Sequence, residues 1–315
     1  MTLLAASEHF AGAPEWTWFI LFYFFVAGLA GGCYFLATLL RYWGSPGDEP
    51  VARLGFYVPF PATLIGLLLL TLDLKQPLRF WHMLVNTTPG QFGLNFNSAT
   101  PMSVGVWVLL VASAFAFVAF VDALARDGRI RHRLAGRLTG LFDGTVGMVW
   151  NVVGTILYLF VAGYTGVLIA VSNQPIWSDS WALGGLFLAS GLSGGAALLL
   201  LLARYRRSAE SSSGVLEISE RLFTLLELLL VVVVLLTLID DGTLGKALSF
   251  PWILLWLVAL AGMLPALWDL AVRGLRAPAG GAVAAGQAWA WAAAPLLVLA
   301  GVLALRAWVI FTAQA

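Results

Sequence analysis

A few polar side chains stand within segments that are otherwise strongly apolar. Charged groups are costly inside a membrane, so each of them is a candidate for ligand binding or for proton movement. If each segment is a helix that rises about 1.5 Å per residue, one set shares a common depth near one end of the segments. It consists of Tyr23, Asp73, Tyr164 and Arg306, with Arg79, His82 and Asn173 in the flanking connections. Tyrosine and histidine can donate hydrogen bonds, arginine can stabilise negative charge, and aspartate can relay protons.

A second polar set lies toward the other end of the apolar segments. Its members are Asp122, Asp143, Glu227 and Asp269, and Asn151 lies between the two sets. Together Asn151, Glu227, Asp122 and Asp269 form a candidate proton path. Glu227 has no Lys or Arg at i±3 or i±4, so it is protonated, paired across helices or in contact with water.

Simpler roles remain open for several of these residues. Asp122 with Arg126, and Asp269 with Arg273, have the i,i+4 spacing of ordinary ion pairs at helix ends. Tyr23 and Tyr164 could be anchors at the membrane interface, where tyrosine is common. Asp73 and Arg306 could neutralise one another, since buried charges need partners.

The elements that must position these residues are membrane-spanning helices. Of the 315 residues, 61% are hydrophobic and 10% are charged, against about 25% charged in soluble domains. Eight apolar segments are long enough for a span of about 20 residues each. They cover residues 18–40, 54–74, 104–125, 144–172, 182–203, 222–239, 251–272 and 289–311. These spans leave no room in the chain for a large catalytic domain outside the membrane.

The positions of the basic residues predict the orientation of the helices. Most Lys and Arg residues fall in the first, third, fifth and seventh connections. The positive-inside rule therefore places these connections in the cytoplasm and both termini on the outer side, so the connection 75–103 is external. The first segment is expected to be a span rather than a cleaved signal peptide, because no Lys or Arg precedes it.

Two stretches of the chain repeat one another. Gly28-Leu29-Ala30-Gly31-Gly32 matches Gly191-Leu192-Ser193-Gly194-Gly195, and Arg41-Tyr42 matches Arg204-Tyr205 at the same spacing. The predicted fold is therefore an all-α integral membrane protein whose eight transmembrane helices form two parallel four-helix halves, 1–173 and 174–315, in one membrane domain. Coincidence in apolar sequence is the alternative, and small residues also allow helices to pack closely.

The composition argues against several classes of protein. A formal charge of +1 offers no basic excess for nucleic-acid phosphates. The single Cys33 excludes structural disulfides, thiolate zinc sites and cysteine-ligated iron–sulfur clusters within the chain. His9, His82 and His132 fall outside the predicted spans, which disfavours haem ligation. We therefore predict no metal site here, and any redox centre must lie on a partner.

Several dispersed motifs resemble those of one known family. They are Trp16-Thr-Trp with Phe25-Val-Ala-Gly28-Leu-Ala-Gly-Gly32, then Leu72-Asp73-Leu-Lys-Gln-Pro77-Leu-Arg79-Phe80, then Pro101-Met102-Ser103 before Gly105-Val-Trp107, then Gly163-Tyr164-Thr165-Gly166 leading to Asn173-Gln174-Pro175 and Trp177, and finally Leu305-Arg306 with Ala313-Gln314. In this order the chain resembles the membrane subunits of polysulfide reductase, the NrfD/PsrC type, over essentially its whole length. One departure is that Ile20 and Tyr23 stand where that subunit has Asn and His.

The resemblance implies a quinone-binding anchor subunit of an oxidoreductase complex. Menaquinone or ubiquinone would bind at the first polar set, where Tyr164 aligns with a tyrosine of the family's site. Tyr164, Asp73 and His82 would take part in the reaction. Tyr23, Arg79, Asn173 and Arg306 would hold the quinone, with arginine stabilising negative charge on its reduced form. Protons would follow the electrons, with translocation through the second polar set as a further possibility.

The resemblance also implies partner proteins. A ferredoxin-like iron–sulfur subunit would dock on the outer face, against the connection 75–103, and would link the chain to a molybdopterin-type catalytic subunit. The complex would sit in the bacterial inner membrane, with neither haem nor iron–sulfur cluster in this chain. The alternative is a secondary transporter or proton channel built from parallel repeats, although transporters more often carry broken helices at the membrane midplane.

Overall fold

Most residues of the protein are helical. The computed structural model describes residues 15–90, 92–130, 133–206, 213–274 and 288–314. Its long helices are α1 (Trp18–Trp43), α4 (Pro101–Arg126), α6 (Thr145–Ala170), α7 (Leu183–Arg204), α8 (Ser213–Asp240), α10 (Ile253–Arg273) and α11 (Ala288–Thr312), and α2 (Glu49–Tyr57) continues into α3 (Pro59–Asp73). Within the described residues, eight segments are long and apolar enough to cross a membrane. The eight predicted spans are confirmed.

Short elements occupy the connections. They are the 3-10 turns η1 (Pro46–Asp48) and η2 (Pro77–Met83), the strands β1 (Val85–Asn86) and β2 (Gly93–Leu94), and the helices α5 (Arg133–Phe142) and α9 (Leu244–Ala247). The strands pair antiparallel, with Val85 opposite Leu94. The prediction did not include this small hairpin or helix α5. It was based on apolar segments long enough to cross a membrane, and both elements lie in the connections between such segments.

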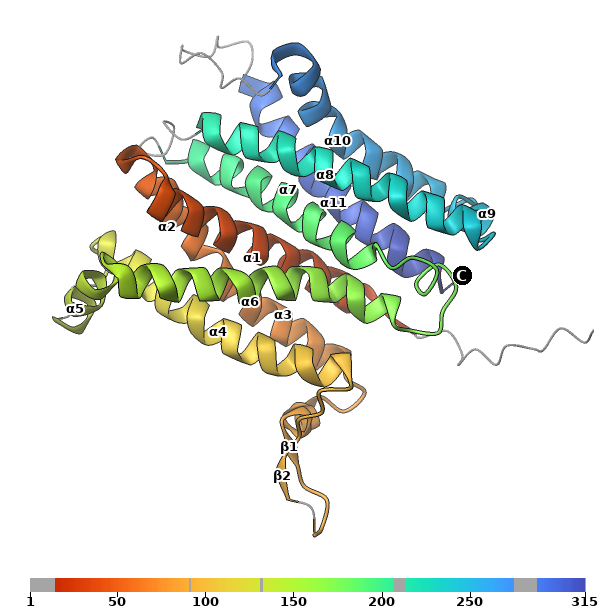
Figure 1. Cartoon of the computed structure of the whole chain (residues 1–315), viewed down its shortest axis with the longest axis horizontal. Coiled ribbons are helices and arrows are strands. Elements are labelled where there is room, and N and C mark those ends of the chain that lie inside the picture. The colour runs from red at the N-terminus through yellow and green to blue at the C-terminus, as the bar shows by residue number, and fades with distance from the viewer. Residues whose placement is uncertain (1–14, 91, 131–132, 207–212, 275–287, 315) are drawn as a thin grey trace, which may run out of the picture.

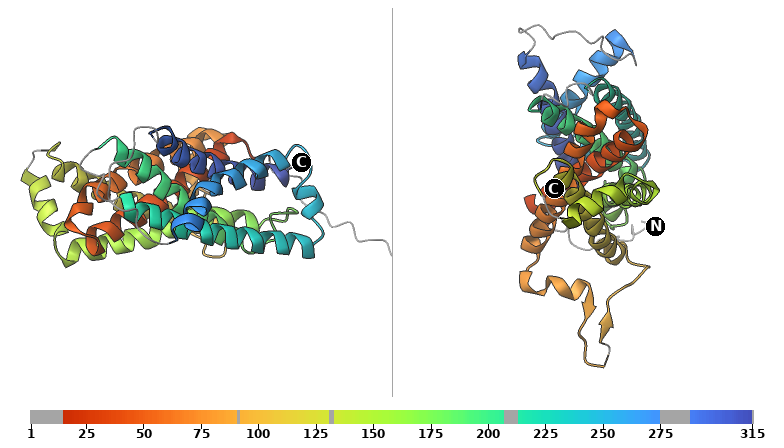
Figure 2. Two further views of the ribbon diagram at one scale, coloured as in Figure 1. Left: turned by 90° about the horizontal axis from the view of Figure 1, so that it is seen from above. Right: turned by 90° about the vertical axis from the view of Figure 1, so that its left-hand side faces the viewer.

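The long helices gather into two groups that lie side by side (Figure 1). The first half comprises α1, α2, α3, α4 and α6, and the second half comprises α7, α8, α10 and α11. The two groups meet chiefly where α1 packs along α7, with further contacts from α6 to α7 and from α1 to α11. Figure 2 shows the elongated bundle from above and from one end. Helices α1 and α7 are thus the central pair.

The matching glycine motifs form the contact between α1 and α7. A Cβ added at Gly195 would lie 2.7 Å from the Cα atom of Gly32, and one added at Gly191 would lie 2.9 Å from the carbonyl oxygen of Gly28. Real side chains do not come this close to backbone atoms. Glycine at these positions therefore allows the two helix backbones to touch. Such close packing matters in a membrane, because the surrounding lipid provides no hydrophobic driving force between helices.

The two ends of the bundle differ in their polar groups. At the end drawn on the left of Figure 1, Arg41 of α1 pairs with Asp122 of α4, and Arg206 beyond α7 pairs with Asp127 beyond α4. We call this the arginine-rich end. At the opposite end, Gln314 accepts a hydrogen bond from the backbone N–H of Trp16 at 2.7 Å. The start of α1 and the end of α11 are therefore adjacent.

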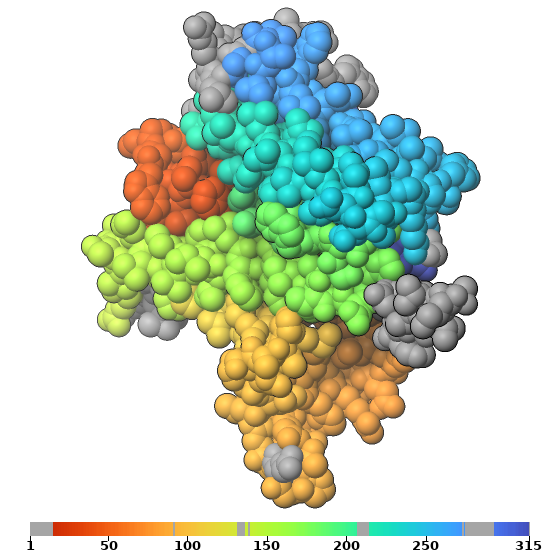
Figure 3. All heavy atoms as spheres, turned by 45° about the vertical axis from the view of Figure 1, so that its right-hand side comes forward, coloured from red at the N-terminus to blue at the C-terminus, as the bar shows by residue number. Residues whose placement is uncertain are grey.

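The connection between α3 and α4 projects sideways from the bundle as a lobe, which we define as residues 75–90 and 92–100. It contains η2 and the β1–β2 hairpin, and it stands clear of the helices in Figures 1 and 3. Large apolar side chains cover it, among them Leu78 at 89% and Phe92 at 81% exposed. Between Leu74 and Val121 the sequence contains no Asp or Glu, whereas Lys75 and Arg79 both lie on the lobe. The lobe is thus apolar and positively charged.

Helix α8 begins earlier than predicted. It starts at Ser213 rather than near residue 222, because Glu217, Glu220 and Arg221 lower the hydropathy of its first turns. Arg221 is therefore not in a connection, as predicted, but inside a helix and 1% exposed. The bundle buries this charge by giving it acceptors, including the carbonyl oxygen of Gly274 at 3.0 Å.

Candidate functional site

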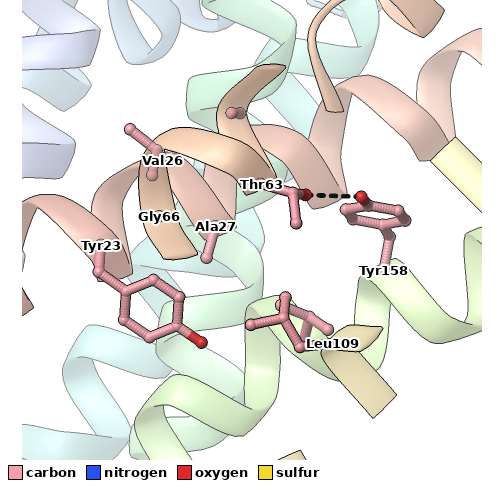
Figure 4. A pocket seen from close by; sticks show the side chains of 9 residues that line it. Tyr23, Val26, Ala27, Thr63, Gly66, Leu109 and Tyr158 are labelled. Atoms are coloured by element: carbon pink, nitrogen blue, oxygen red, sulfur yellow. Dashed lines mark hydrogen bonds between the residues drawn. The ribbon is translucent and has the colours of Figure 1, made fainter. Parts of the chain in front are cut away.

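A small cavity lies within the first half (Figure 4). Its walls come from α1, α3, α4 and α6 and consist of Tyr23, Val26, Ala27, Ala62, Thr63, Gly66, Leu109, Tyr158 and Val161. Most of this wall is apolar, and its side-chain hydroxyl groups belong to Tyr23, Thr63 and Tyr158. The space that it leaves open to a water-sized sphere is about 10 Å³, which is about enough for one water molecule. A ring-sized group would therefore enter only if side chains of the wall moved apart.

Two of the predicted site residues, Tyr23 and Tyr164, lie beside one another next to this cavity. They are 6% and 8% exposed, and their hydroxyls are close enough to interact electrostatically. An added Cβ at Gly66 would come within 3.0 Å of the Tyr23 ring, and the Tyr164 ring occupies the space that a side chain at Gly105 would need. Tyr164 also stacks on Phe160, with 5.6 Å between ring centroids. Both tyrosines are buried in the bundle, unlike anchors at a lipid interface.

Four other predicted residues lie toward the opposite end or on the lobe. The carboxylate of Asp73, at the end of α3, accepts a hydrogen bond from the Thr17 hydroxyl at 3.0 Å. Arg79 is exposed on the lobe, and the His82 ring lies against Trp81. Asn173 is exposed just beyond α6. The structure therefore buries the tyrosine pair and leaves Arg79 and Asn173 at the surface.

Arg306 belongs to a buried polar network of the second half. It is fully buried and donates to the Ser190 hydroxyl at 2.7 Å and to the carbonyl oxygen of Phe187 at 3.0 Å. The Ser193 hydroxyl, one turn along α7, donates to the carboxylate of Glu227 at 2.7 Å. Glu227 and Arg306 also interact electrostatically. Of the alternatives for Glu227, the structure thus supports pairing across helices.

The alternative in which Asp73 and Arg306 neutralise one another is not what the structure shows. The Arg306 guanidinium lies against Gly28 of α1, whereas Asp73 bonds Thr17, eleven residues or roughly 16 Å earlier along the chain. Asp73 accepts its hydrogen bond from Thr17 before α1, whereas the Arg306 guanidinium is directed into α7. Counting residues along separate predicted helices gave the two residues one depth, but the packing of α11 against α7 and α1 places Arg306 deeper in the bundle.

The predicted pair of Asp122 with Arg126 is confirmed and proves to be part of a larger cluster. Arg126 contacts the fully buried Asp122 at 2.9 Å and Asp143 at 2.7 Å. Arg41 of α1 also reaches Asp122, at 2.6 Å, and contacts Glu49 at 3.0 Å. This cluster joins α1, α2 and α4 at the arginine-rich end.

The second predicted pair, Asp269 with Arg273, includes a side chain outside the described residues, that of Arg273. The carboxylate of Asp269 contacts Arg221 of α8 instead, at 3.3 Å. Arg221 also contacts Glu217 at 3.5 Å, one turn earlier on its own helix. The buried Arg221 therefore joins α8 to α10.

Asn151 joins two tyrosines of α1. Its Oδ1 atom accepts a hydrogen bond from the Tyr34 hydroxyl at 3.1 Å, and its Nδ2 atom donates to the Tyr42 hydroxyl at 2.9 Å. Asn151 and Tyr34 are both fully buried. The predicted proton path thus divides between the halves, with Asn151 and Asp122 in the first and the other two acids in the second.

Beyond the spans, Asp127 ties several elements together at the arginine-rich end. It accepts from Arg53 at 2.6 Å, from Arg206 at 2.7 Å and from the Tyr57 hydroxyl at 2.8 Å. Burial raises the pKa of Asp127, but the hydrogen bonds from Arg206 and Tyr57 and the charges of Arg206 and Arg53 lower it by more. The pKa of Asp127 therefore lies below its usual range, and the ionised cluster holds α2, α4 and the end of α7 together.

Metal-binding side chains do not gather in the described part of the chain. No group of three or more His, Cys, Asp or Glu residues there could hold a metal ion. Cys33 is buried and donates weakly to the carbonyl oxygen of Gly195, at 3.7 Å. The candidate site is thus made of hydroxyl, amide and charged groups.

Comparison with known proteins assigns the chain to a family. The family model described as polysulphide reductase, NrfD, matches residues 6–315. The chain belongs to the NrfD family. A polysulfide reductase chain from Wolinella succinogenes is 30% identical over 190 residues, which cover 57% of this chain and 55% of the relative. Protein NrfD of Escherichia coli is 28% identical over 193 residues, which cover 58% and 57%.

A third relative of this NrfD-family chain is a selenate reductase subunit from Mesobacillus selenatarsenatis. It is 26% identical over 138 residues, which cover 44% of this chain and 30% of the relative. The chain spans about half the length, or less, of these curated relatives. Eight apolar helices and membership of the NrfD family indicate a multi-pass membrane protein, and two of the relatives are named as parts of a polysulfide reductase and of a selenate reductase.

Some polar groups of this NrfD-family chain escaped prediction. Ser190 and Ser193 join Arg306 to Glu227, and their only signal was the Ser-x-x-Ser spacing within an apolar helix. Tyr34 was not predicted because an aromatic residue within a span usually belongs to the hydrophobic core. Its hydroxyl shows a role only when Asn151, more than a hundred residues later in the chain, comes beside it.

Proposed function

We propose that the chain is the quinone-binding membrane anchor of a multi-subunit oxidoreductase, which exchanges electrons between the quinone pool and an iron–sulfur subunit. One observation supports this above the others. Tyr23 and Tyr164 are buried together beside a largely apolar cavity in the membrane-spanning region. Membership of a family whose relatives are named as reductase subunits is consistent with it.

The headgroup of a quinone would bind at this cavity as its wall side chains move apart. A quinone ring needs apolar walls and a few donors at its two oxygens, and here Val26 and Leu109 supply walls while Tyr23 lines the space. The hydroxyl of Tyr164 lies close by. The space now open is about 10 Å³, so the ring would displace wall side chains, and the isoprenoid tail would extend into lipid. A bound quinone would supply the two-electron chemistry, and the tyrosines would orient its oxygens.

Asp73 would relay protons between water and the quinone site. It ends α3, seven residues after the cavity residue Gly66, which corresponds to about 10 Å along the helix. Its hydrogen bond from Thr17 lies at the surface, so its carboxylate can exchange protons with water. Arg79, His82 and Asn173 would act at the mouth of the site, whereas Arg306 lies in the other half.

The lobe between α3 and α4 is the proposed docking surface for the iron–sulfur subunit. Its exposed apolar residues, Phe92 and Leu78 among them, would be covered by the partner, since large exposed apolar patches mark interaction sites. The iron–sulfur subunit would be ferredoxin-like and would lead to a molybdopterin-type catalytic subunit. Copurification of such subunits, identified by mass spectrometry, would separate this function from that of an independent transporter.

The orientation and the repeat are part of the same proposal. The positive-inside rule would place the arginine-rich end in the cytoplasm and both termini on the outer side of the bacterial inner membrane. The contact between the two glycine motifs of α1 and α7 is what two parallel four-helix halves related by a repeat would produce. The lobe would then face the outer side, where the iron–sulfur subunit binds.

Replacement of Tyr164 by Phe and of Asp73 by Asn tests the quinone site. In the assembled complex, Tyr164→Phe should lower quinone-linked turnover by about tenfold, because it removes a hydrogen bond to a developing charge. Asp73→Asn should lower it by removing the proton relay. The controls are Tyr205→Phe, which changes a tyrosine that is 84% exposed, and Asp240→Asn, which changes an exposed aspartate. Unchanged rates in both site variants would refute the proposed site.

The buried network around Glu227 is the proposed route for proton translocation in the second half. Glu227 accepts from Ser193, and Glu220, two turns away on α8, is 8% exposed. Arg221 and Asp269 continue the polar groups to the arginine-rich end. Carboxyl groups with several polar neighbours in a membrane interior are typical of proton relays.

Replacement of Glu227 by Gln should lower the number of protons translocated per electron while leaving quinone binding intact, because Gln keeps the shape of Glu but carries no exchangeable acid proton. Proton release by the complex in proteoliposomes, divided by quinol formed or consumed, measures the ratio. Glu15→Gln, at a side chain that is 89% exposed, is the matched control. A ratio equal to that of the unsubstituted complex would remove Glu227 from the route.

A further inference from the structure

The connection between α4 and α6, at the arginine-rich end, contains a stretch of unbalanced positive charge. Residues 128–142 include no Asp or Glu. The arginines of this basic stretch are Arg129, Arg131, Arg133 and Arg137. The acids on either side, Asp127 and Asp143, pair with arginines outside the stretch, at 2.6 and 2.7 Å. The basic stretch therefore keeps its positive charge.

Helix α5, which forms most of the basic stretch, is attached to the bundle by one of its faces. Phe142 is 4% exposed, and its ring centroid lies 6.3 Å from that of Trp150. The carbonyl oxygen of Thr139 accepts a hydrogen bond from the Arg126 guanidinium at 3.2 Å, and that of Phe142 accepts from the Tyr42 hydroxyl at 3.4 Å. These contacts give α5 a fixed place on the bundle.

Another face of α5 is exposed. Arg137 is exposed, and Leu141, one turn later, is 56% exposed. Residues four apart lie on the same face of a helix, so a charged and a large apolar side chain are neighbours there. Arg129 is also exposed, shortly before the helix begins. Arginine combined with leucine in this way is typical of helices that lie at the surface of a bilayer.

The position of α5 agrees with such a role. In Figures 1 and 2 it lies across the end of the bundle instead of running along α4 and α6. Beyond it, one face of α6 exposes large apolar side chains at helical spacing, and these are Val146, Val149, Val153, Ile156 and Phe160. In a membrane this row faces acyl chains. A lipid whose acyl chains lie along the row would have its headgroup at the level of α5.

We infer that α5 and the residues just before it form a binding surface for anionic phospholipids, whose phosphate groups are bound by the arginines of the basic stretch. The arginine guanidinium binds phosphate through two parallel hydrogen bonds. A zwitterionic lipid also carries a phosphate, but its own ammonium group cancels the charge. The surface therefore prefers a headgroup of net negative charge, such as that of phosphatidylglycerol.

The exposed leucine argues for lipid rather than for an acidic protein as the occupant. Leu141 lies one turn from Arg137, and a lipid satisfies both residues at once, with its acyl chain on the first and its phosphate on the second. Since α5 joins α4 to α6, which both contribute to the wall of the cavity, a bound lipid would also hold these two helices together at the arginine-rich end.

Native mass spectrometry of the full-length chain tests the inference, because it resolves each bound lipid by mass. Dissociation constants are measured for phosphatidylglycerol and phosphatidylcholine with the same acyl chains, added to the detergent in increasing amounts. Phosphatidylglycerol should bind more tightly. The double variant Arg129→Gln with Arg137→Gln should weaken its binding by about tenfold or more, since each basic side chain near anionic headgroups contributes about fivefold in affinity. Binding of phosphatidylcholine should stay as it is.

Lys75→Gln with Lys246→Gln is the matched control. It removes two exposed positive charges away from the arginine-rich end and should leave the affinity for phosphatidylglycerol unchanged. Arg129→Lys with Arg137→Lys keeps the charges and should recover most of the affinity. An equal loss in the glutamine variant and in the control would overturn the inference, because net charge alone would then explain binding. Equal affinity of the unsubstituted chain for the two lipids would also overturn it, and this comparison needs no variant to fold.

Discussion

Replacement of Arg306 by Met is expected to destabilise the protein by about 3–5 kcal/mol, the usual cost of removing one member of a buried charge pair. Arg306 is fully buried and donates to Ser190 and to the carbonyl oxygen of Phe187. Its loss leaves Glu227, which is 3% exposed, without the cation that it interacts with. Both acceptors on α7 also lose their donor.

Unfolding of the purified protein in detergent, followed by circular dichroism, measures this loss. Arg79→Met is the control, because Arg79 is exposed on the lobe and should change the free energy of unfolding by less than about 0.5 kcal/mol. The double variant Arg306→Met with Glu227→Gln should be more stable than Arg306→Met alone, because it removes the isolated charge. Strict additivity of the two single losses would show that the residues are not coupled.

The same variant separates two roles for Arg306. A residue that held the quinone would raise the KM for quinone in the fraction that remains folded. A residue that neutralises Glu227 and holds α11 against α7 would lower the amount of folded complex and leave that KM unchanged. The contacts of Arg306 with α7 favour the second outcome.

The spans could be predicted from the sequence because lipid leaves the backbone few choices. Every N–H and C=O group inside the membrane must be hydrogen-bonded within the chain, so an apolar run of sufficient length is a helix. The prediction failed at the start of α8, where Glu217, Glu220 and Arg221 mask a helix that continues for two more turns. Those charges are tolerated because α10 supplies Asp269 as a partner, and hydropathy contains no information on partners.

The sequence predicted that Tyr23 and Tyr164 lie at one level, but it did not predict the partners of the site residues. The local pair of Asp122 with Arg126 follows from the geometry of one helix and is confirmed. The contact of Arg41 with Asp122 joins residues far apart in the sequence, and no periodic pattern predicts it. Counting residues along helices placed Tyr23 and Tyr164 at one level, and the packing of α1 with α6 then brought them together.

The positions of several glycines mark close contacts between helices. In the repeated motifs of α1 and α7 they were interpreted as packing residues, and the structure shows the two backbones in contact there. Gly105 and Gly154 have a different purpose, because each makes room for a tyrosine hydroxyl of another helix. Identical residue types thus serve packing in one place and a polar site in another, and only the facing side chain distinguishes them.

Gly105→Ala should therefore damage the proposed quinone site without removing any polar group. The added methyl group would overlap the ring and the hydroxyl of Tyr164, so the ring must move away from its place beside Tyr23. Displacement of a reacting or orienting group by about 1 Å costs on the order of 10²-fold in rate, and we expect a loss of that size in quinone-linked turnover.

Gly163→Ala is the matched control for this prediction. It makes the same change on α6, one residue before Tyr164, where an added Cβ would make only an ordinary contact at 3.4 Å with the carbonyl oxygen of Gly184. Turnover and complex yield should stay near those of the unsubstituted protein. A further variant, Gly105→Ala with Tyr164→Phe, should be no slower than Gly105→Ala, since the displaced hydroxyl no longer contributes. Equal turnover in Gly105→Ala and Gly163→Ala would mean that the position of the Tyr164 ring does not govern the reaction.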